Sequence, residues 1–268
     1  MDLLVDGKRV YAATGGRPFD PQKPVTVFIH GAGQDHTNWQ LPARWCAWHG
    51  QAVLALDLPG HGRSEGPALP AVAELAAWIG PVLAAASADR ATLVGHSLGG
   101  AIALEAAARL AQRVHGLILL GAAAALPVNA ELLRAARESP AEAHRLITTW
   151  ALGADAKRGG NAVPGLWLSN ASLALLARNG PGVLAADFEA CSGWTSGPAA
   201  AARVRCPTLI IIGAHDVMTP PRAGRQLAQA IAGAEVVTVA NCGHTLMAEA
   251  PDAVLDALIA FFRPRRAA

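Results

Sequence analysis

The sequence predicts an α/β protein built on a mostly parallel sheet. Short apolar, β-rich runs recur along the chain, and helical patterns alternate with them. The runs are apolar almost throughout, which indicates strands buried on both faces. The chain has 268 residues, of which 52% are hydrophobic, so it is long enough to bury a substantial core.

The first predicted element is a hairpin. Two short apolar runs are joined by Asp6-Gly7, and this dipeptide is the strongest two-residue hairpin signal. An antiparallel edge to the sheet is therefore expected.

Strands and helices then alternate. Strands are expected over Val25–Ile29, Ala52–Leu56, Ala91–Gly95, Gly116–Leu120, Pro207–Ile212 and Glu235–Val239. Helices are expected over Trp39–His49, Ala71–Ala86, Leu98–Gln112, Arg222–Ala232 and Asp252–Phe262. This alternation is typical of a parallel sheet with helices on its faces.

One long stretch interrupts the alternation. Residues 122–205 show helical segments and glycine turns but no convincing strand, so we predict a core of residues 1–121 and 206–268 with an inserted helical cap at 122–205. Helices within it are expected over Asn129–Glu138, Ala141–Leu152, Ser172–Arg178 and Pro181–Cys191. Trp150, Trp167 and Trp194 of this insertion are candidates for the wall of a substrate pocket, although packing of the cap on the core explains each equally well.

Charge and composition exclude several classes of protein. The net charge is +2 and 16% of the residues are charged, so there is no basic stripe for nucleic acid, and the Arg-Pro-Arg-Arg ending is interpreted as a solvated tail. The first residues lack the pattern of a signal peptide, and no apolar run is long enough to span a membrane. We expect a cytoplasmic protein whose cysteines, Cys46, Cys191, Cys206 and Cys242, are unpaired.

A nucleophile is predicted within residues 92–102, which read Thr-Leu-Val-Gly-His-Ser-Leu-Gly-Gly-Ala-Ile. The apolar run ends at Ser97 and continues as a helical pattern. A serine at such a sharp strand-to-helix turn adopts strained backbone angles, and Gly95 and Gly99 remove Cβ atoms that would clash across the bend. The amide of Leu98 falls at the helix N-terminus, where an unpaired donor can stabilise an oxyanion.

A base and an orienting acid follow later in the chain. A serine hydroxyl is a weak nucleophile at neutral pH, so it needs a neighbouring base and a third group that holds this base. His244 follows the last predicted strand, and Asp216 follows the strand before it, both at the C-terminal edge of the sheet. We therefore predict a catalytic triad of Ser97, Asp216 and His244.

Other polar residues near these motifs are interpreted as structural. His96 adjoins the nucleophile and should point away from it, while His215 precedes Asp216 and cannot easily bond with it. Asp57 begins a glycine-rich turn and is predicted to order that loop. The other position for an orienting acid, after Leu120, reads Gly-Ala-Ala-Ala-Ala and supplies none, which favours Asp216.

A second oxyanion donor is expected after the strand Val25–Ile29. The sequence there reads His30-Gly31-Ala32-Gly33, and its glycines let the main chain approach a ligand closely. We predict that the N–H groups of Ala32 and Leu98 form the oxyanion hole.

Together these motifs resemble the α/β-hydrolase superfamily. The matching residues are His30 to Gly33 with Trp39, Asp57 to Ser64, Gly95 to Gly100, Asp216, and Gly243-His244, and they span nearly the whole chain except the insertion. The resemblance is to the capped carboxylesterase, perhydrolase, enol-lactonase and carbon–carbon hydrolase branches. It implies an α/β-hydrolase fold with a mostly parallel eight-stranded sheet, flanking helices and an inserted cap, and no cofactor or metal.

The activity that the resemblance implies is acyl transfer to water. We expect a carboxylic ester hydrolase that acts on small to medium apolar acyl esters through an acyl-enzyme, as a monomer or homodimer, with no nucleic acid partner. A serine rather than an aspartate nucleophile argues against haloalkane dehalogenases and epoxide hydrolases. Hydrolysis of a lactone, a thioester or a carbon–carbon bond by the same triad is an alternative. A non-catalytic ligand receptor is another, although such a protein would be expected to lose a triad member.

Overall fold

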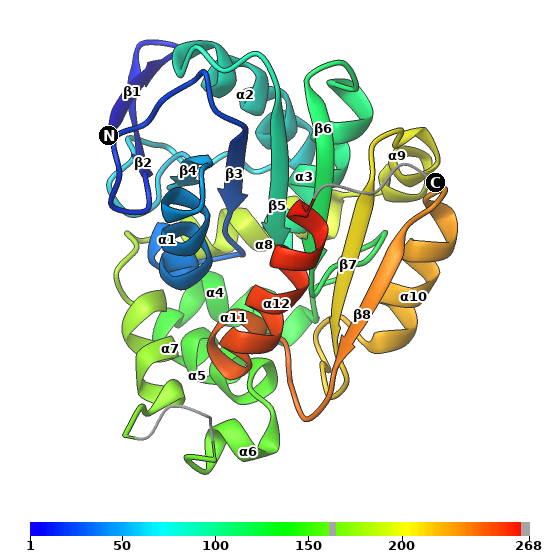
Figure 1. The fold of residues 1–268 in the computed structure, drawn as a ribbon. Coiled ribbons are helices and arrows are strands. Elements are labelled where there is room, and N and C mark those ends of the chain that lie inside the picture. Colours follow the sequence, from blue (N-terminus) through cyan, green and yellow to red (C-terminus); the bar gives the residue numbers. More distant parts are fainter. Residues whose placement is uncertain (161–164, 264–268) are drawn as a thin grey trace.

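The computed structural model describes residues 1–160 and 165–263. The basic ending beyond Arg263, predicted as a solvated tail, lies outside the described residues. Figure 1 shows a central twisted sheet with helices on both faces and a group of further helices at one end.

The sheet has eight strands in the order β1-β2-β4-β3-β5-β6-β7-β8. The pairs β1–β2 and β2–β4 are antiparallel, and all other pairs are parallel. The strands are β1 Asp2–Val5, β2 Lys8–Ala13, β3 Val25–Ile29, β4 Ala52–Leu56, β5 Ala91–His96, β6 Val114–Leu120, β7 Thr208–Gly213 and β8 Glu235–Val239. The predicted mostly parallel sheet with an antiparallel edge is confirmed.

The edge hairpin forms at the expected dipeptide. Asp6 and Gly7 have φ values of 49° and 77°, and two successive positive φ values are the mark of the hairpin turn that matches strand twist. The strands β3, β4 and β8 have the bounds that the sequence predicted, and the other predicted strands differ by one or two residues.

The helices follow the predicted alternation, with four short additions. They are η1 His36–Trp39, α1 Gln40–Trp48, α2 Val72–Ala85, α3 Leu98–Arg109, α4 Ala130–Glu138, α5 Pro140–Ala151, α6 Ala154–Lys157, α7 Leu168–Leu176, α8 Val183–Gly193, α9 Gly197–Arg203, α10 Pro221–Ala230, α11 Leu246–Glu249 and α12 Pro251–Phe262. The sequence did not predict η1, α6, α9 and α11, because helices this short show too few turns for a periodic pattern.

Each inner strand supplies side chains to two cores. Val27 and Ile29 of β3 belong to the core under α2, α3, α9 and α10, whereas Phe28 belongs to the core under α1 and α12. This is the period-two alternation of a strand, and coverage of both faces explains why every residue of the strand except Thr26 is apolar. All four cysteines are free thiols.

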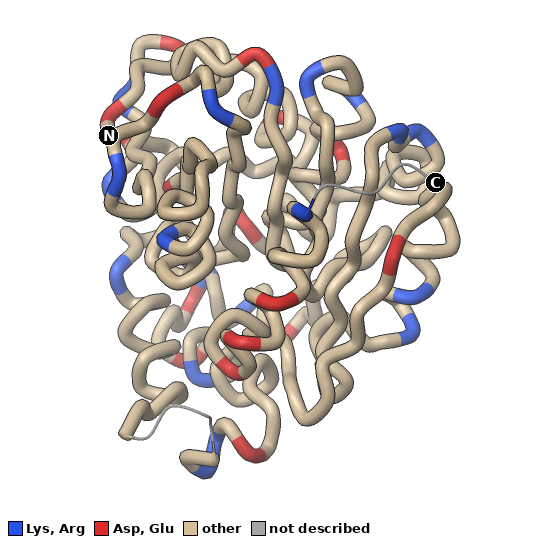
Figure 2. The backbone as a smooth tube through the Cα atoms, in the orientation of Figure 1, with Lys and Arg blue, Asp and Glu red and all other residues tan. Residues whose placement is uncertain are grey.

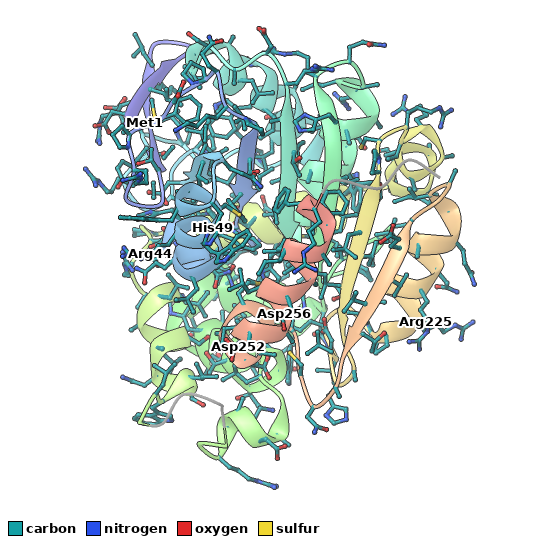
Figure 3. The ribbon with its side chains drawn as sticks, viewed as in Figure 1. Met1, Arg44, His49, Arg225, Asp252 and Asp256 are labelled. Carbon is teal, nitrogen blue, oxygen red and sulfur yellow. The ribbon has the colours of Figure 1, made fainter. Side chains whose placement is uncertain are left out.

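The helices on the two faces are amphipathic. On α10 Leu227 is buried while Arg225 projects outward, and on α12 Leu258 is buried while Asp252 and Asp256 are exposed (Figure 3). Lys and Arg are interspersed with Asp and Glu along the chain rather than gathered in one stripe (Figure 2). Over the described ranges, the structure contains no helix with the length and hydrophobicity needed to cross a bilayer.

The insertion between β6 and β7 builds most of a separate core. Helices α4, α5, α7 and α8 pack their apolar side chains together, including Leu132, Ile147, Leu176, Leu184 and Phe188. In Figure 1, α4, α5, α6 and α7 lie beyond the carboxyl ends of β3 and β5. The last helix, α9, instead packs on α3 at the face of the sheet. The division into a core and a cap at residues 122–205 stays a prediction.

Candidate active site

Ser97 occupies a strained turn between β5 and α3. Its φ and ψ are 54° and −118°, a conformation that a residue with a side chain adopts only when its surroundings enforce it. A Cβ atom on Gly95 would lie 2.1 Å from the Gly99 carbonyl oxygen, and one on Gly99 would lie 2.2 Å from that of Ile29. The predicted sharp turn and the need for both glycines are confirmed.

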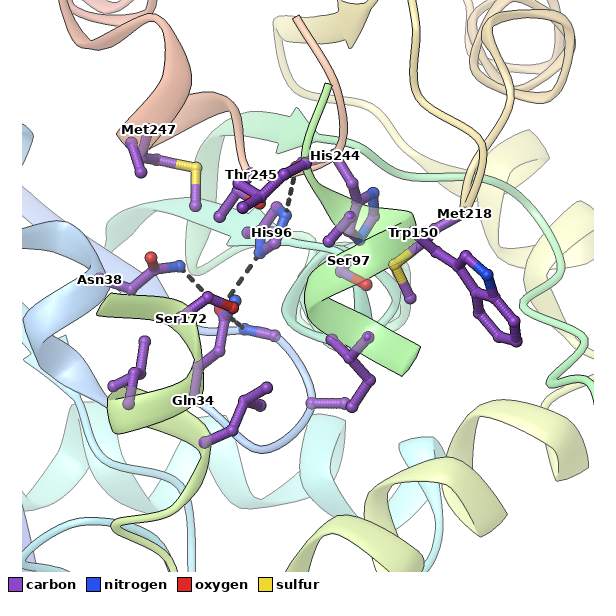
Figure 4. A pocket seen from close by; sticks show the side chains of 18 of the residues that line it. Gln34, Asn38, His96, Ser97, Trp150, Ser172, Met218, His244, Thr245 and Met247 are labelled. Atoms are coloured by element: carbon purple, nitrogen blue, oxygen red, sulfur yellow. Dashed lines mark hydrogen bonds between the residues drawn. The ribbon is translucent and has the colours of Figure 1, made fainter. Parts of the chain in front are cut away.

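His244 and Asp216 form a buried pair at the same edge of the sheet. His244 follows β8 and Asp216 follows β7, and His244 Nδ1 lies 2.8 Å from Asp216 Oδ2. Because a carboxylate oxygen only accepts, Nδ1 carries the proton and donates it. The other ring nitrogen, Nε2, is then left as an acceptor. His244 lines a cavity together with Ser97 (Figure 4).

The loop after β7 holds the Asp216 carboxylate. The backbone N–H groups of Met218 and Thr219 each donate to Oδ1 at 2.9 Å, and the Thr219 hydroxyl donates to Oδ2 at 2.7 Å. Burial alone would raise the pKa of Asp216, yet the charge of His244 and the hydrogen bonds from His244 and Thr219 outweigh burial and lower it. Asp216 is therefore ionised at neutral pH.

Two backbone N–H groups, in the loop after β3 and directly after Ser97, have no acceptor among the described residues. The N–H groups of Gly31 and Gly33 are bonded to Gln34 Oε1 and Asp187 Oδ2. Between them the Ala32 N–H donates to no acceptor among the described residues, and neither does the Leu98 N–H at the start of α3. Free donors at a helix N-terminus and in a glycine-rich loop are suited to hold a developing negative charge.

A cavity of about 790 Å³ opens onto Ser97 and His244. Figure 4 shows Gln34, Asn38 and Ser172 on one side of Ser97, with Trp150 and Met218 on the other. The rest of the wall is mainly aliphatic and comes largely from the insertion, with residues including Leu126, Val128, Leu132, Ile147, Leu152, Leu168, Leu175 and Leu176. The cavity therefore has one polar side and a larger apolar side.

Only one of the three candidate tryptophans lines this cavity. Trp150 of α5 is in its wall. Trp167, just before α7, is instead 63% exposed, and Trp194 is buried at the end of α8 with its Nε1 donating to Glu105 Oε2 of α3 at 3.3 Å. The prediction that Trp167 and Trp194 line the pocket is corrected, because the first faces solvent and the second packs the insertion onto the core.

His96 does not turn away from the site as predicted. It lines the cavity, its ring lies 4.7 Å from the His244 ring, and its Nε2 lies 2.9 Å from the His244 carbonyl oxygen. Burial, together with the neighbouring His244, lowers the pKa of His96 to about 3, so the ring is neutral. The Nε2–H therefore donates to His244. His215, which directly precedes Asp216, is exposed and does not line the cavity.

Gln34 is a cavity residue that the sequence analysis missed. Its Oε1 accepts from the Gly31 N–H at 3.0 Å and from Asn38 Nδ2 at 2.7 Å. Both Gln34 and Asn38 lie in the polar stretch after β3, between the segment His30 to Gly33 and Trp39. A polar side chain three residues after a glycine that approaches the nucleophile is the signal that could have identified it.

Asp57 has the loop-ordering contacts that were predicted. Its Oδ1 accepts from the His36 N–H and from His36 Nδ1, both at 2.8 Å, and its Oδ2 accepts from the Arg63 N–H at 2.8 Å. Ligand atoms of Asp35, His36 and Asp57 lie within 4.8 Å of one another, as at a metal site. The Arg178 guanidinium, however, lies 3.2 Å from Asp35 Oδ2, so hydrogen-bond donors and an arginine already compensate these carboxylates.

Comparison with known proteins shows similarity to hydrolases. The chain is 30% identical over 257 residues to the pimeloyl-[acyl-carrier protein] methyl ester esterase of Aromatoleum aromaticum, covering 86% of this chain and 94% of that protein. It is 34% identical over 238 residues to the 2-hydroxymuconate semialdehyde hydrolase of Pseudomonas sp. strain CF600, covering 81% of this chain and 79% of that protein.

A solved structure extends the similarity to the fold. The crystal structure of the enol-lactonase from Burkholderia xenovorans LB400 superposes with a TM-score of 0.86 at 25% identity, over 97% of this chain and 99% of that one. These similarities support a hydrolase. The sequence model of the alpha/beta hydrolase family matches residues 26–257, and the chain therefore belongs to the alpha/beta hydrolase family.

Proposed function

We propose that the protein is a serine-dependent carboxylic ester hydrolase that acts on small to medium apolar acyl esters through an acyl-enzyme. One observation carries this proposal. A serine in a strained turn lines one cavity together with Ala32 and with a histidine whose imidazole is held by a buried carboxylate, and the N–H groups of Ala32 and Leu98 have no acceptor among the described residues. These are the parts that acyl transfer by a serine requires.

The first half of the reaction forms the acyl-enzyme. The Ser97 Oγ attacks the ester carbonyl carbon while His244 Nε2 takes the hydroxyl proton, and the Ala32 and Leu98 N–H groups hold the resulting oxyanion. When the tetrahedral intermediate collapses, the bond from carbon to the alcohol oxygen breaks and His244 returns the proton to that oxygen. Asp216 holds the imidazole in its tautomer and stabilises the transient imidazolium.

The second half releases the acid. A water molecule attacks the acyl carbon, His244 Nε2 accepts a proton from it, and the same N–H groups hold the second oxyanion. The bond between carbon and Ser97 Oγ then breaks, and the proton returns to the serine. No other reactant is consumed, so the two halves sum to ester plus water giving acid plus alcohol.

The cavity wall favours an uncharged acyl group. Within the described residues it includes no carboxylate, and Arg178, its single guanidinium, already lies against Asp35. Burial of an apolar acyl chain against the aliphatic wall contributes about 0.8 kcal/mol per methylene. An uncharged, apolar acyl chain of small to medium length therefore suits this cavity better than an acyl chain that carries a negative charge.

Lactone hydrolysis is a second candidate. It uses the same atoms, except that the leaving oxygen stays tethered to the acyl group. The similarity to an enol-lactonase over almost the whole chain favours it specifically, and the polar side formed by Gln34, Asn38 and Ser172 offers hydrogen bonds to a ring oxygen or hydroxyl. Thioester and carbon–carbon bond hydrolysis stay open as further uses of the triad.

The test compares the wild type with Ser97→Ala. Both are incubated with a fluorophosphonate probe, followed by mass spectrometry, and assayed with nitrophenyl esters of increasing chain length and with a panel of lactones. We expect labelling of the wild type alone, ester turnover lowered about ten-thousand-fold or more by the substitution, and an unchanged circular dichroism spectrum. Ester turnover that survives the substitution would refute the proposal, while labelling with turnover of lactones only would select the second candidate.

A further inference from the structure

A carboxylate of the insertion bonds directly to the loop after β3. Asp187 of α8 places its Oδ2 2.7 Å from the Gly33 backbone N and 2.9 Å from His61 Nε2. Asp187 and His61 are each 1% exposed. One buried oxygen therefore joins three segments that are far apart in the sequence, namely the loop after β3, the loop after β4 and the insertion.

A second side chain of the insertion makes a parallel connection. Asn179 Nδ2, in the turn between α7 and α8, donates to the Gly33 carbonyl oxygen at 2.8 Å and to that of Gln34 at 3.2 Å, and its Oδ1 accepts from the Gly62 N–H at 3.0 Å. The insertion thus satisfies both the N–H and the C=O of Gly33. Each of its two side chains also reaches the loop at residues 61–62.

The insertion also packs on this loop. A Cβ atom on Gly33 would lie 2.9 Å from Leu184 Cδ1 and 3.0 Å from Leu176 Cδ2, and the Ala32 side chain packs against the core of the insertion. Gly33 has a φ of 66°, which residues other than glycine rarely adopt. The insertion therefore holds the N–H of the peptide that follows Ala32 and the carbonyl oxygen of the next peptide, and it lies in close contact with Gly33 between them.

The buried pair of Asp187 and His61 favours the protonated form of the His61 ring. Burial alone would lower the pKa of His61, but the charge and hydrogen bond of Asp187 outweigh it, with a further hydrogen bond to the Pro59 carbonyl, and raise the pKa above the ordinary value. A buried charged pair whose members also bond to backbone groups resists displacement, because separating the charges leaves each of them uncompensated.

We infer that Asp187 and Asn179 are positioning residues for the oxyanion hole, which fasten the Gly33 peptide so that the Ala32 N–H points at the reacting carbonyl. This inference rests on the proposed function, in which the Ala32 N–H is an oxyanion donor. It gives the insertion a role in the chemical step in addition to its share of the cavity wall. Because oxyanion donors act only on charge that develops in the transition state, loss of the fastening lowers kcat rather than raising KM.

The experiment uses the full chain with three variants and a matched control. Asp187→Ala removes the bridging oxygen, Asp187→Asn keeps an oxygen without the charge, and Asn179→Ala removes the second connection from a half-buried position. Glu189→Gln is the control, because Glu189 lies on the same helix and its ion pair with Arg137 is exposed. Circular dichroism and thermal unfolding report whether each variant folds.

The readouts separate positioning from folding. Kinetic constants for a nitrophenyl ester are measured together with the inhibition constants of a trifluoromethyl ketone and of the methyl ketone of the same chain length. The serine adds to the carbonyl carbon of the trifluoromethyl ketone, and the carbonyl oxygen becomes the oxyanion of the resulting hemiketal. We expect Asp187→Ala to lower kcat about a hundred-fold and Asn179→Ala about tenfold, with KM and methyl ketone binding unchanged. Affinity for the trifluoromethyl ketone should fall in proportion to kcat/KM. Asp187→Asn should recover part of the loss, and Glu189→Gln should match the wild type.

Two results would overturn the inference. One is folded Asp187 and Asn179 variants that keep wild-type kcat and trifluoromethyl ketone affinity. The other is an equal loss of affinity for both ketones, which indicates a disturbed cavity rather than a misplaced donor. If Asp187→Ala does not fold, Asn179→Ala decides by the same criteria. A failure of the proposed function is distinct from both, because the wild type itself would then show neither ester turnover nor selective binding of the trifluoromethyl ketone.

Discussion

His96 donates a hydrogen bond to the backbone of His244, with 2.9 Å between His96 Nε2 and the His244 carbonyl oxygen. The two residues lie 148 positions apart in the chain, one directly before the proposed nucleophile and the other the proposed base. The neutral ring of His96 therefore ties the loop that carries the base to the turn that carries the nucleophile.

Replacement of His96 by Leu should lower kcat by about tenfold, because one hydrogen bond that holds the His244 loop is lost. His96→Gln offers an N–H in a similar place and should recover part of the rate. The measurement is the pH dependence of kcat/KM, in which a loosened base shifts the acidic limb as well as the plateau. An unchanged profile and an unchanged kcat in His96→Leu would show that the contact has no effect on catalysis.

Loss of Asp216 should lower kcat far more than loss of the Thr219 hydroxyl that supports it. Asp216→Asn is expected to lower kcat by about ten-thousand-fold, because an amide facing His244 Nδ1 favours the wrong tautomer. Thr219→Val removes only the hydroxyl that donates to Asp216 Oδ2 and should cost about tenfold. Steady-state kinetics on one ester, with thermal unfolding as a control for folding, measures both. Equal losses in the two variants would contradict this order.

Truncation of the tryptophans tests which of them meets the substrate. Trp150→Ala enlarges the cavity and removes apolar contact, so it should raise KM for short acyl esters and move the preferred chain length upward. Trp167→Ala is the matched control, because Trp167 is exposed and outside the cavity wall. A series of nitrophenyl esters measures the preference. A shift caused by Trp167→Ala and not by Trp150→Ala would contradict the described cavity.

Lowering the pH should begin to destabilise the fold at pH values well above the ordinary pKa of carboxylates. Burial lowers the pKa of His30 to about 4 and that of His96 to about 3, from an ordinary value of 6.5. As the pH falls below 6.5, the unfolded chain binds protons that the folded state does not, so the free energy of unfolding falls by about 2 kcal/mol per histidine between pH 7 and pH 5. His61 acts in the opposite sense, because its pKa is raised, so its contribution is present at low pH and is lost as the pH rises through that value.

Urea unfolding at pH 7 and pH 5 measures this dependence. His30→Gln should reduce the difference between the two pH values, whatever its effect on absolute stability, because one of the buried rings that resist protonation is gone. Equal free energies of unfolding at both pH values in the wild type would contradict the proposed origin.

The parts of the fold that sequence reasoning predicted are those with a local signal. The strand Val25–Ile29 is apolar on both faces, and Asp6-Gly7 marks the turn between β1 and β2 by backbone preference alone. The glycines around Ser97 mark a close approach that a side chain would block. Each of these signals lies within a few residues of the structure it predicts.

The parts that it missed depend on contacts between distant segments. Nothing beside His96 indicates that its ring meets the His244 loop, and nothing beside Trp194 indicates that its indole bonds to Glu105 of α3. Asp187 carried a weak local signal, as a lone acid between the buried Leu184 and Phe188 of α8. A charged residue on a buried helix face needs a partner, but the sequence alone does not identify His61 as that partner.

The place where the insertion joins the sheet has a consequence for how such proteins diversify. It leaves at the end of β6 and returns at β7, and these strands pair side by side, with Leu117 opposite Thr208 and Leu120 opposite Ile211. Both attachment points therefore belong to one rigid unit, so an exchange of the whole insertion between relatives alters the cavity while the strands that carry Ser97 and Asp216 keep their register. If Asp187 positions the oxyanion hole as inferred above, such an exchange is constrained at one point. An insertion from a relative must supply its own acceptor for the Gly33 N–H, because without one the protein would have a new cavity but a low kcat.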